Sequence, residues 1–503
     1  MFLSKYNLKN IETGKVELPE DAMFHLPERV LQFGTGALLR GLPDYFIDKA
    51  NRQGIFNGRI VVVKSTNKGD SDAFDKQDGL YTLCVRGIEE GKKIEENIVC
   101  SAISRVLSAR HEWQAVLECA HNPQMQVVIS NTTEVGIQLV NEDIRNQPPV
   151  SFPAKLLAFL HQRYIAFDGS KQSGMVIVPT ELINNNGKKL ESILLDLAHL
   201  NGLDENFIEW LENSNHFCNS LVDRIVPGPD KKVQKEMEEE MGVTDELLIV
   251  SEVYRLWAIE GNRAVENILS FAKADNGVVI TEDITLFKEL KLRLLNATHS
   301  LSCGVAFLSG IGTVREAMED KVMERFISEL MMLEIAPAIP YDVTVLQAEE
   351  FGNRVLDRFR NAFIQHQWLS ITLNYTQKLQ ARAIPVLLRY YEKFQMVPEN
   401  FSTAFAAYLL FMKAVKVNGE QYYGHANGKD YLINDEKASY YYKLWQKHDV
   451  AEIVSIVLQE VDLWDADLTK LGGFELEVAE KLKMMITEGL PVTLQTKKVL
   501  QEK

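Results

Sequence analysis

The chain has 503 residues, of which 46% are hydrophobic and 25% are charged, and 70 acidic against 54 basic residues give a formal net charge of −16. This composition is typical of a globular protein with more than one domain. The negative charge argues against a nucleic-acid-binding protein, which needs a basic face. The sequence contains neither an apolar run of membrane-spanning length nor the apolar core of a signal peptide. We therefore expect a cytoplasmic protein without a nucleic-acid or membrane partner.

The cysteines are scattered singly, at positions Cys84, Cys100, Cys119, Cys218 and Cys303. No Cys-x2-Cys pair is present, and no His/Cys/Asp cluster has the spacing of zinc ligands. We expect reduced, mostly buried thiols and a protein that uses no metal.

The first half of the chain alternates short β-rich runs with helical patterns. The clearest runs are RVLQF (29–33), RIVVVK (59–64), QVVIS (126–130) and MVIVP (175–179). Continuous Val/Ile runs are typical of strands buried on both faces, and the alternation with helices predicts a mostly parallel sheet. Residues 80–106 differ and suggest an antiparallel excursion from that sheet.

From about residue 281 onward, helical periodicity dominates and strand signals nearly vanish. The sequence therefore predicts a Rossmann-like α/β domain over residues 1–280 and an all-α domain over residues 281–503. The break between the two halves is expected near residues 265–285.

A glycine turn follows the first predicted strand, in VLQFGTGALLRG (30–41). In a dinucleotide-binding fold, a first glycine such as Gly34 permits the tight turn, and a second such as Gly36 lets the backbone approach a pyrophosphate. The third glycine position is occupied by Leu39, and Pro43 is expected to delay the first regular helical turn to about residue 42. The predicted cofactor-binding residues here are Phe33, Gly34, Thr35 and Gly36.

The second predicted strand lacks the acid that usually holds the adenosine ribose. It ends in VVVKSTNKGD, with Lys64 and Ser65 and no acid before Asp70. Lys64 and Lys68 lie where they could accept the 2′-phosphate of a phosphorylated dinucleotide.

The stretch KLRLLNATHS (291–300) lies in a pattern that predicts a buried helix from Thr285 to Leu301. Unpaired polar groups are costly in such a helix, yet it carries Lys291, Asn296 and His299. Burial lowers the pKa of a lysine toward the range of a general base, which alcohol oxidation requires. An amide and an imidazole three residues apart share a helix face and suit the stabilisation of an oxyanion. Taken singly, the lysine is more often a solvated residue and the Asn or His a satisfied core or surface group. Because the three occur together after a dinucleotide-like half, we predict them as the catalytic group.

Several stretches together resemble the polyol-specific long-chain dehydrogenases, also called the mannitol dehydrogenase family. They occur in the family's order and are FGTGALLRG, ISNTTEVGI (129–137), NSLVDRIVP (219–227), SEVYRLWAIE (251–260) and KLRLLNATH. Lys-x4-Asn-x2-His is the family's catalytic signature. The resemblance implies an NAD-dependent, metal-independent hydride transfer with Lys291 as general acid/base. PTELINNNG (179–187) and SITLNYTQK (370–378) most resemble the branch that interconverts tagaturonate and altronate in hexuronate breakdown.

The resemblance also implies binding residues. It places Asp223, of VDRIVP, beside the substrate, although an ion pair with Arg224 is an equal alternative. It places the residues after the third predicted strand at the nicotinamide, where the carboxyl ends of parallel strands bind ligands; a helix cap is the alternative for the threonines. These residues are Asn131, Thr132, Thr133 and Glu134.

A sugar-acid substrate needs cations in this acidic protein. Lys378 matches a substrate-contacting lysine of the family, and Arg382 lies one helical turn further on. Arg358 and Arg360 are additional candidates, because the forked guanidinium suits a carboxylate, although each alone is more often a solvated helix charge.

Two family residues are missing. Leu182 occupies the place of a second asparagine, for which Glu181 and Asn184 are the candidate substitutes, and Ser370 lies near the place of an arginine. These departures indicate a different substrate end. The alternatives are a mannonate (fructuronate-reducing) or mannitol-type dehydrogenase and, in another class, a non-catalytic dinucleotide sensor. A phosphotransfer enzyme is disfavoured because no Gly-x4-Gly-Lys-Ser/Thr loop is present.

Overall fold

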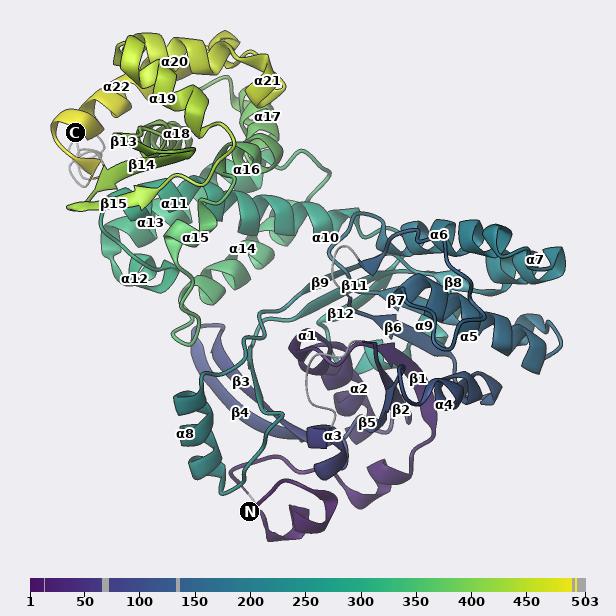
Figure 1. Cartoon of the computed structure of the whole chain (residues 1–503). Coiled ribbons are helices and arrows are strands. Elements are labelled where there is room, and N and C mark those ends of the chain that lie inside the picture. The colour runs from purple at the N-terminus through teal and green to yellow at the C-terminus, as the bar shows by residue number, and fades with distance from the viewer. Residues whose placement is uncertain (13, 66–71, 133–135, 491–493, 495–503) are drawn as a thin grey trace. The chain divides into compact units, whose positions relative to one another are not determined.

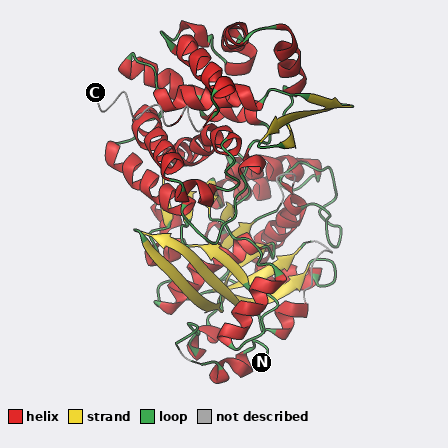
Figure 2. Ribbon diagram, turned by 90° about the vertical axis from the view of Figure 1, so that its left-hand side faces the viewer, coloured by secondary structure: helices red, strands yellow, loops and turns green. Residues whose placement is uncertain are grey.

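The structure is a computed structural model that describes residues 1–12, 14–65, 72–132, 136–490 and 494. It divides into two compact units: residues 1–87 with 93–284, and residues 88–92 with 285–503. The first unit holds the large sheet, and the second is largely helical (Figures 1 and 2). No helix in the described ranges is long and apolar enough to cross a membrane. All five cysteines are free and buried.

The first unit is built on a six-stranded sheet in the order β5-β2-β1-β6-β7-β8, in which all neighbours pair in parallel. Numbered by their appearance in this sheet, the strands run 3-2-1-4-5-6, the order of a dinucleotide-binding Rossmann fold. The strands are β1 Glu28–Phe33, β2 Arg59–Lys64, β5 Ile103–Ser108, β6 Val127–Ser130, β7 Val176–Pro179 and β8 His216–Phe217. The prediction of a mostly parallel sheet is confirmed.

Both faces of this sheet are covered, which explains the continuous Val/Ile runs. Leu31 and Phe33 pack into one apolar core, while Val30 between them packs into the other, because successive strand residues point to opposite faces. The first core takes side chains from α4 to α7, and the second from α1 and α2. The helices of this unit are α1 Ala37–Gly41, α2 Pro43–Arg52, α3 Asp72–Lys76, α4 Trp113–Glu118, α5 Phe152–Ala166, α6 Asn186–Leu200, α7 Glu205–Ser214, α8 Lys231–Met241 and α9 Arg263–Ile268.

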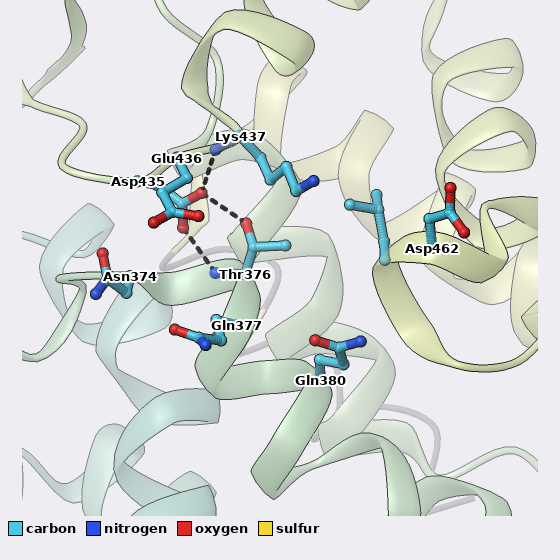
Figure 3. Close-up of a pocket in the computed structure, with 9 residues that line it drawn as sticks. Asn374, Thr376, Gln377, Gln380, Asp435, Glu436, Lys437 and Asp462 are labelled. Carbon is cyan, nitrogen blue, oxygen red and sulfur yellow. Dashed lines mark hydrogen bonds between the residues drawn. The ribbon is translucent and has the colours of Figure 1, made fainter.

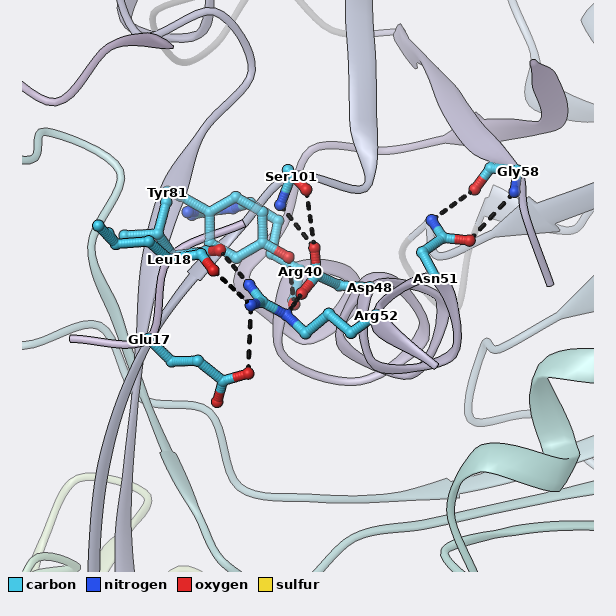
Figure 4. Close-up of polar contacts among 10 residues, drawn as sticks. Glu17, Leu18, Arg40, Asp48, Asn51, Arg52, Gly58, Tyr81 and Ser101 are labelled. Atoms are coloured by element: carbon cyan, nitrogen blue, oxygen red, sulfur yellow. Dashed lines mark hydrogen bonds and ion pairs between the residues drawn. The ribbon is translucent and has the colours of Figure 1, made fainter. Parts of the chain in front are cut away.

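The helix after the glycine turn is broken into α1 and α2. We expected Pro43 to delay the first regular turn to about residue 42, but α1 begins at Ala37, and Pro43 instead starts α2 after a non-helical Leu42. Proline is tolerated there because the first amides of a helix have no intrahelical acceptor. Polar contacts then fix α2 (Figure 4): Asp48 accepts a bond from the Ser101 amide (2.7 Å), and Asn51 exchanges two bonds with the backbone of Gly58 (2.8 and 3.1 Å).

Two three-stranded sheets complete the first unit, in the orders β10-β3-β4 and β12-β11-β9. β3 and β4 are joined by Glu90 and Gly91, both with positive φ. The excursion predicted for residues 80–106 is therefore present in part: β3 pairs in parallel with β10, and residues 103–106 belong to β5 of the parallel sheet. The strands are β3 Tyr81–Glu89, β4 Lys92–Cys100, β9 Ser220–Asp223, β10 Ile249–Glu252, β11 Leu256–Glu260 and β12 Val278–Thr281.

The second unit consists largely of helices, as predicted. They are α10 Thr285–Leu290, α11 Thr298–Leu308, α12 Val314–Glu319, α13 Lys321–Glu329, α14 Val345–Phe359, α15 Trp368–Ile371, α16 Tyr375–Arg382, α17 Ile384–Phe394, α18 Glu399–Phe411, α19 Ala438–Lys447, α20 Val450–Gln459, α21 Val461–Trp464 and α22 Phe474–Thr487. Two π-helical segments interrupt this pattern, η7 at Lys291–Ala297 and η8 at Leu330–Ile335.

The second unit also contains a small antiparallel sheet that the all-α prediction omitted. It comprises β13 Lys416–Asn418, β14 Gln421–Ala426 and β15 Lys429–Leu432. Asn427 and Gly428 both adopt positive φ between β14 and β15, the hairpin turn that Asn-Gly favours. The Asn-Gly dipeptide is the one local pattern that indicates this hairpin. The residues around it are mostly exposed and polar, so they do not show the apolar alternation that predicts a strand.

Candidate active site

The glycine turn after β1 has the backbone that a dinucleotide site requires. Gly34 has φ +126°, and a Cβ built on it would lie 2.9 Å from Leu39 Cδ1 and 3.0 Å from the Asn131 carbonyl oxygen. Gly36 is exposed, and a Cβ built on it would meet no atom within 4 Å. Gly34 is therefore needed for the fold of the turn, whereas Gly36 leaves open space beside the backbone. Leu39, in place of the third glycine, fills the space against Gly34.

The carboxyl ends of β1, β6 and β7 meet beside this turn, where the strand order reverses. The Asn131 amide donates to the Phe33 carbonyl oxygen (3.1 Å), and its side chain donates to Thr180 Oγ1 (3.0 Å). The Phe33 side chain packs on Phe152 with ring centroids 5.1 Å apart, so only its backbone borders the turn. Ligands of such sheets bind at this reversal point. Thr133 and Glu134, also predicted here, lie outside the described residues, as do Lys68 and Asp70 of the second strand's end.

Glu181, considered as a substitute for the missing second asparagine, is already engaged. Its buried carboxylate accepts bonds from the Thr132 amide (2.8 Å), Thr132 Oγ1 (3.0 Å) and Ser130 Oγ (3.1 Å). It therefore orders the backbone that follows β6. Leu182 and Asn184 are both exposed.

Asp223 is buried at the end of β9, opposite Leu256 of β11. The neighbouring Arg224 donates to the Gly41 carbonyl oxygen (2.6 Å) and the Glu252 carbonyl oxygen (3.0 Å). Burial lowers the pKa of Arg224 to about 10. The guanidinium thus ties β9 to α1 and β10 through backbone oxygens.

In the second unit, the predicted catalytic stretch is a π-helix over Lys291–Ala297 and not a continuous α-helix. A π-helix bonds residue i to residue i+5, so it stacks side chains five apart where an α-helix stacks those four apart. Lys291 and Asn296 are five apart and both half-buried. The π geometry therefore brings onto one face two residues that an α-helix would separate, and such segments are frequent at functional sites.

His299, at the start of α11, lies in an aromatic enclosure. Its ring stacks on Phe359 (centroids 4.3 Å apart, 14° between planes) and meets His366 (5.2 Å) and Trp368 (5.9 Å) edge-on. Its Nε2 is buried without a hydrogen-bond partner among the residues that the structure describes. Burial, followed by the charges of His366, Arg358, Arg382 and Lys378, holds the pKa of His299 well below its ordinary value. The lowered pKa favours the neutral imidazole.

Three of these neighbours are basic side chains, Lys378, Arg382 and Arg358, and we define them as the cationic cluster around His299. His366 contacts His299 as well, but burial and the charges of Lys378 and Arg358 lower the pKa of His366, so it adds no cation to the cluster. Burial and the charge of Arg382 lower the pKa of Lys378, whose Nζ donates to the Ile371 carbonyl oxygen at 2.9 Å. Arg382 donates to Ser300 Oγ at 3.1 Å. The sequence had indicated Lys378, Arg382 and Arg358, but not His366, which lies in a loop without periodicity.

The structure also places Arg360 and Ser370, which the sequence analysis named. Arg360 lies directly after α14 and forms ion pairs with Glu324 (2.8 Å) and Asp357 (3.4 Å). Ser370, near the place of the missing arginine, is exposed on α15.

A separate pocket of about 190 Å³ lies on another side of α16 (Figure 3). Thr376, Gln377 and Gln380 line it from α16, together with three acidic residues, Asp435, Glu436 and Asp462, and one basic residue, Lys437. Its carboxylates do not suit an anionic substrate. No group of three or more metal-ligating side chains is found in the described part of the chain.

A Rossmann sheet with a glycine turn, joined in one chain to a helical unit with a Lys-x4-Asn-x2-His segment, defines the class of two-domain sugar and polyol dehydrogenases. Residues 28–273 match the model of the mannitol dehydrogenase Rossmann domain, and residues 283–486 match the model of the mannitol dehydrogenase C-terminal domain. The chain therefore belongs to the mannitol dehydrogenase family of oxidoreductases.

Curated relatives and solved structures agree with this assignment. An altronate oxidoreductase of Bacillus subtilis (strain 168) is 37% identical over 473 residues, covering 93% of this chain and 95% of the relative. One from Escherichia coli O7:K1 is 36% identical over 473 residues, covering 92% and 95%. The fold resembles Pseudomonas fluorescens mannitol 2-dehydrogenase (TM-score 0.68, 23% identity, 100% of both chains) and a D-sorbitol dehydrogenase (TM-score 0.80, 21% identity, 98% of this chain and 100% of the other).

Proposed function

We propose that this chain is an NAD-dependent oxidoreductase that reduces D-tagaturonate with NADH to D-altronate and NAD and catalyses the reverse reaction. The observation that carries the proposal is the cationic cluster around His299, in a protein with a net charge of −16. Such a cluster favours an anionic ligand over a neutral one, because it offsets the repulsion of the overall field. The names of the relatives in B. subtilis and E. coli, altronate oxidoreductase, support a sugar acid as that ligand.

In the proposed mechanism, Lys291 donates a proton from Nζ to the ketone oxygen while that carbon receives a hydride. In the reverse direction, Lys291 accepts the hydroxyl proton. A bound nicotinamide supplies or accepts the hydride. The Asn296 amide donates to the reacting oxygen, and the neutral His299 hydrogen-bonds the substrate through Nε2. A positioned general acid of this kind contributes about 10²- to 10⁴-fold in rate.

The first unit fits a dinucleotide. The open space at Gly36 and the contact of Asn131 with the Phe33 carbonyl oxygen at the sheet's reversal point support a cofactor site there, which would include Thr35 between the two glycines. We propose NAD, on the strength of family membership, although β2 ends in Lys64 and not in an acid. A comparison of kcat/KM for NADH and NADPH tests this choice, and a clear preference for NADPH would reverse it.

A panel of keto-uronates, aldonates, ketoses and polyols, followed by nicotinamide absorbance, tests the substrate. We expect tagaturonate and altronate to give the highest kcat/KM. Faster reduction of fructuronate would make the chain a mannonate-type enzyme, and faster turnover of fructose or mannitol a mannitol-type enzyme. NADH binding without turnover of any of them would indicate a non-catalytic dinucleotide sensor.

The Lys378→Met variant tests the carboxylate contact. Because a hydrogen bond to a charged group contributes about 1.5–3 kcal/mol, we expect KM for tagaturonate to rise about 10- to 100-fold. The effect on a neutral ketose should be much smaller. Lys393→Met, in α17, is the matched control, since Lys393 donates to the Pro337 carbonyl oxygen on the surface. Equal losses for both substrates would contradict this role of Lys378.

A further inference from the structure

A proline interrupts the helix that carries Lys378 and Arg382. α16 ends at Arg382, and α17 begins at Ile384 with Pro385 in its first turn. In a continuous helix, the amide of residue 385 would donate to the carbonyl oxygen of Ala381. Proline has no N–H, so this carbonyl is left without its helical donor, as the last carbonyls of any helix are.

Arg293 supplies the missing donor from another part of the unit. Its Nη1 donates to the Ala381 carbonyl oxygen and to the Arg382 carbonyl oxygen, both at 2.8 Å. Its Nε pairs with Glu289 at 2.9 Å, and the Arg293 side chain is 7% exposed. A cation at the end of a helix also interacts favourably with the helix dipole.

Arg293 belongs to the π-helix, two residues after Lys291. A second contact runs in the opposite direction, because Arg382 Nη1 donates to Ser300 Oγ (3.1 Å) and Ser300 Oγ donates to the Asn296 carbonyl oxygen (2.9 Å). The segment 291–300 and the end of α16 are therefore joined at two places.

We propose that Arg293 is a positioning residue that caps the proline break after α16 and thereby sets the register of Lys378 and Arg382 against Lys291, Asn296 and His299. This inference rests on the proposed function for the roles of those five residues. Arg293 has no role in proton transfer. It acts through α16, because a shift of α16 by a fraction of a helical turn displaces both substrate cations together.

The Arg293→Met variant keeps the apolar stem and removes all donors. We expect kcat/KM for tagaturonate to fall about 10- to 100-fold, mainly through KM, because misplacement of binding groups is costly. Arg293→Lys should give an intermediate value, since one ammonium replaces a planar fork. Arg315→Met is the matched control: Arg315 forms the same i,i+4 pair with Glu319 at 2.9 Å on an exposed helix face, and its loss should leave KM unchanged. Equal kinetics for Arg293→Met and Arg315→Met would overturn the inference.

The double variant Arg293→Met/Pro385→Ala separates positioning from general stability. Alanine restores an amide N–H at position 385, which can donate to the Ala381 carbonyl oxygen. We expect it to recover several-fold of the KM lost in Arg293→Met, whereas Pro385→Ala alone should bring no gain. Absence of recovery in a folded double variant would count against the capping role.

Amide hydrogen exchange of residues 375–386 gives a readout independent of substrate. Arg293→Met should accelerate exchange there, and Arg315→Met should not. If wild-type protein fails to turn over any uronate, the proposed function is wrong, and exchange still decides the inference. Unchanged exchange over residues 375–386 would overturn it.

Discussion

The glycine turn of the first unit presents backbone groups, whereas the Lys291–His299 segment of the second unit presents side chains. At the turn, the exposed groups are backbone, and the neighbouring side chains of Asn131 and Glu181 already have protein partners. In the second segment, the candidate catalytic groups are side chains on a π-helix and on the helix that follows, and His299 Nε2 has no partner among the described residues.

This difference teaches what each region requires of its sequence. A site formed by backbone groups requires residues that leave the space beside the backbone empty, and those are glycines. A side-chain site requires particular functional groups and neighbours that set their electrostatics, and these neighbours come from α14, α16 and the loop before α15. Substitutions in the two regions should therefore fail in different ways.

The largest effect is expected from Lys291→Ala. Loss of the proposed general acid/base should lower kcat about 10²- to 10⁴-fold. NADH affinity, measured by fluorescence titration, should remain as in the wild type, because Lys291 belongs to the second unit and the cofactor residues to the first. Near-wild-type turnover in a folded variant would remove Lys291 from the mechanism.

The glycine pair offers a sharper test of the backbone site. Gly34→Ala places a Cβ 2.9 Å from Leu39 Cδ1 at φ +126°, so it should lower both the melting temperature and NADH affinity. Gly36→Ala meets no protein atom within 4 Å, so it should lower only NADH affinity, by about tenfold, a loss of about 1.4 kcal/mol. If Gly36→Ala binds NADH normally, the open space at Gly36 is not where the cofactor approaches.

Much of the first unit could be predicted from the sequence. The four strands predicted at 29–33, 59–64, 126–130 and 175–179 are apolar runs because both faces of the sheet are covered. Gly34 and Gly36 come directly after the first of these strands. The split of the helix at Leu42 was missed, because α1 fits between the turn and Pro43 as a single short piece. The hydrogen bonds that Ser130 and Thr132 donate to the Glu181 carboxylate form because β6 and β7 are neighbours in the sheet. The sequence around each strand does not show which strands are neighbours.

Less of the second site could be predicted. The proposed catalytic roles of Lys291, Asn296 and His299 depend on a resemblance to the family motif. An α-helix was predicted where η7 is a π-helix, because apolar periodicity does not distinguish the two over seven residues. His366 reaches His299 across more than sixty residues of sequence, through tertiary packing alone. The same holds for Arg293, which reaches the Ala381 and Arg382 carbonyl oxygens 88 and 89 residues further along the chain.

The smallest effect concerns a buried pair beside the glycine turn, which tests whether the first site depends on backbone alone. Gln32 Nε2 donates to Asp44 Oδ2 (3.3 Å) and to the Gly34 carbonyl oxygen (3.4 Å). Burial raises the pKa of Asp44 to about 8, so the folded protein keeps this carboxyl protonated at neutral pH.

Asp44→Asn retains the shape of that protonated carboxyl and removes its titration. Between the unfolded pKa of 3.8 and the folded pKa of about 8, only the folded wild type holds the proton, so its stability falls as pH rises. The free energy of unfolding of Asp44→Asn relative to wild type should therefore increase with pH across this range, by at most about 1.4 kcal/mol per pH unit. Urea unfolding at pH 5, 6, 7 and 8 measures this slope, and a constant difference would show that Asp44 is ionised in the fold. NADH affinity should stay unchanged; a loss would mean that a side chain, and not only the glycine backbone, forms the cofactor site.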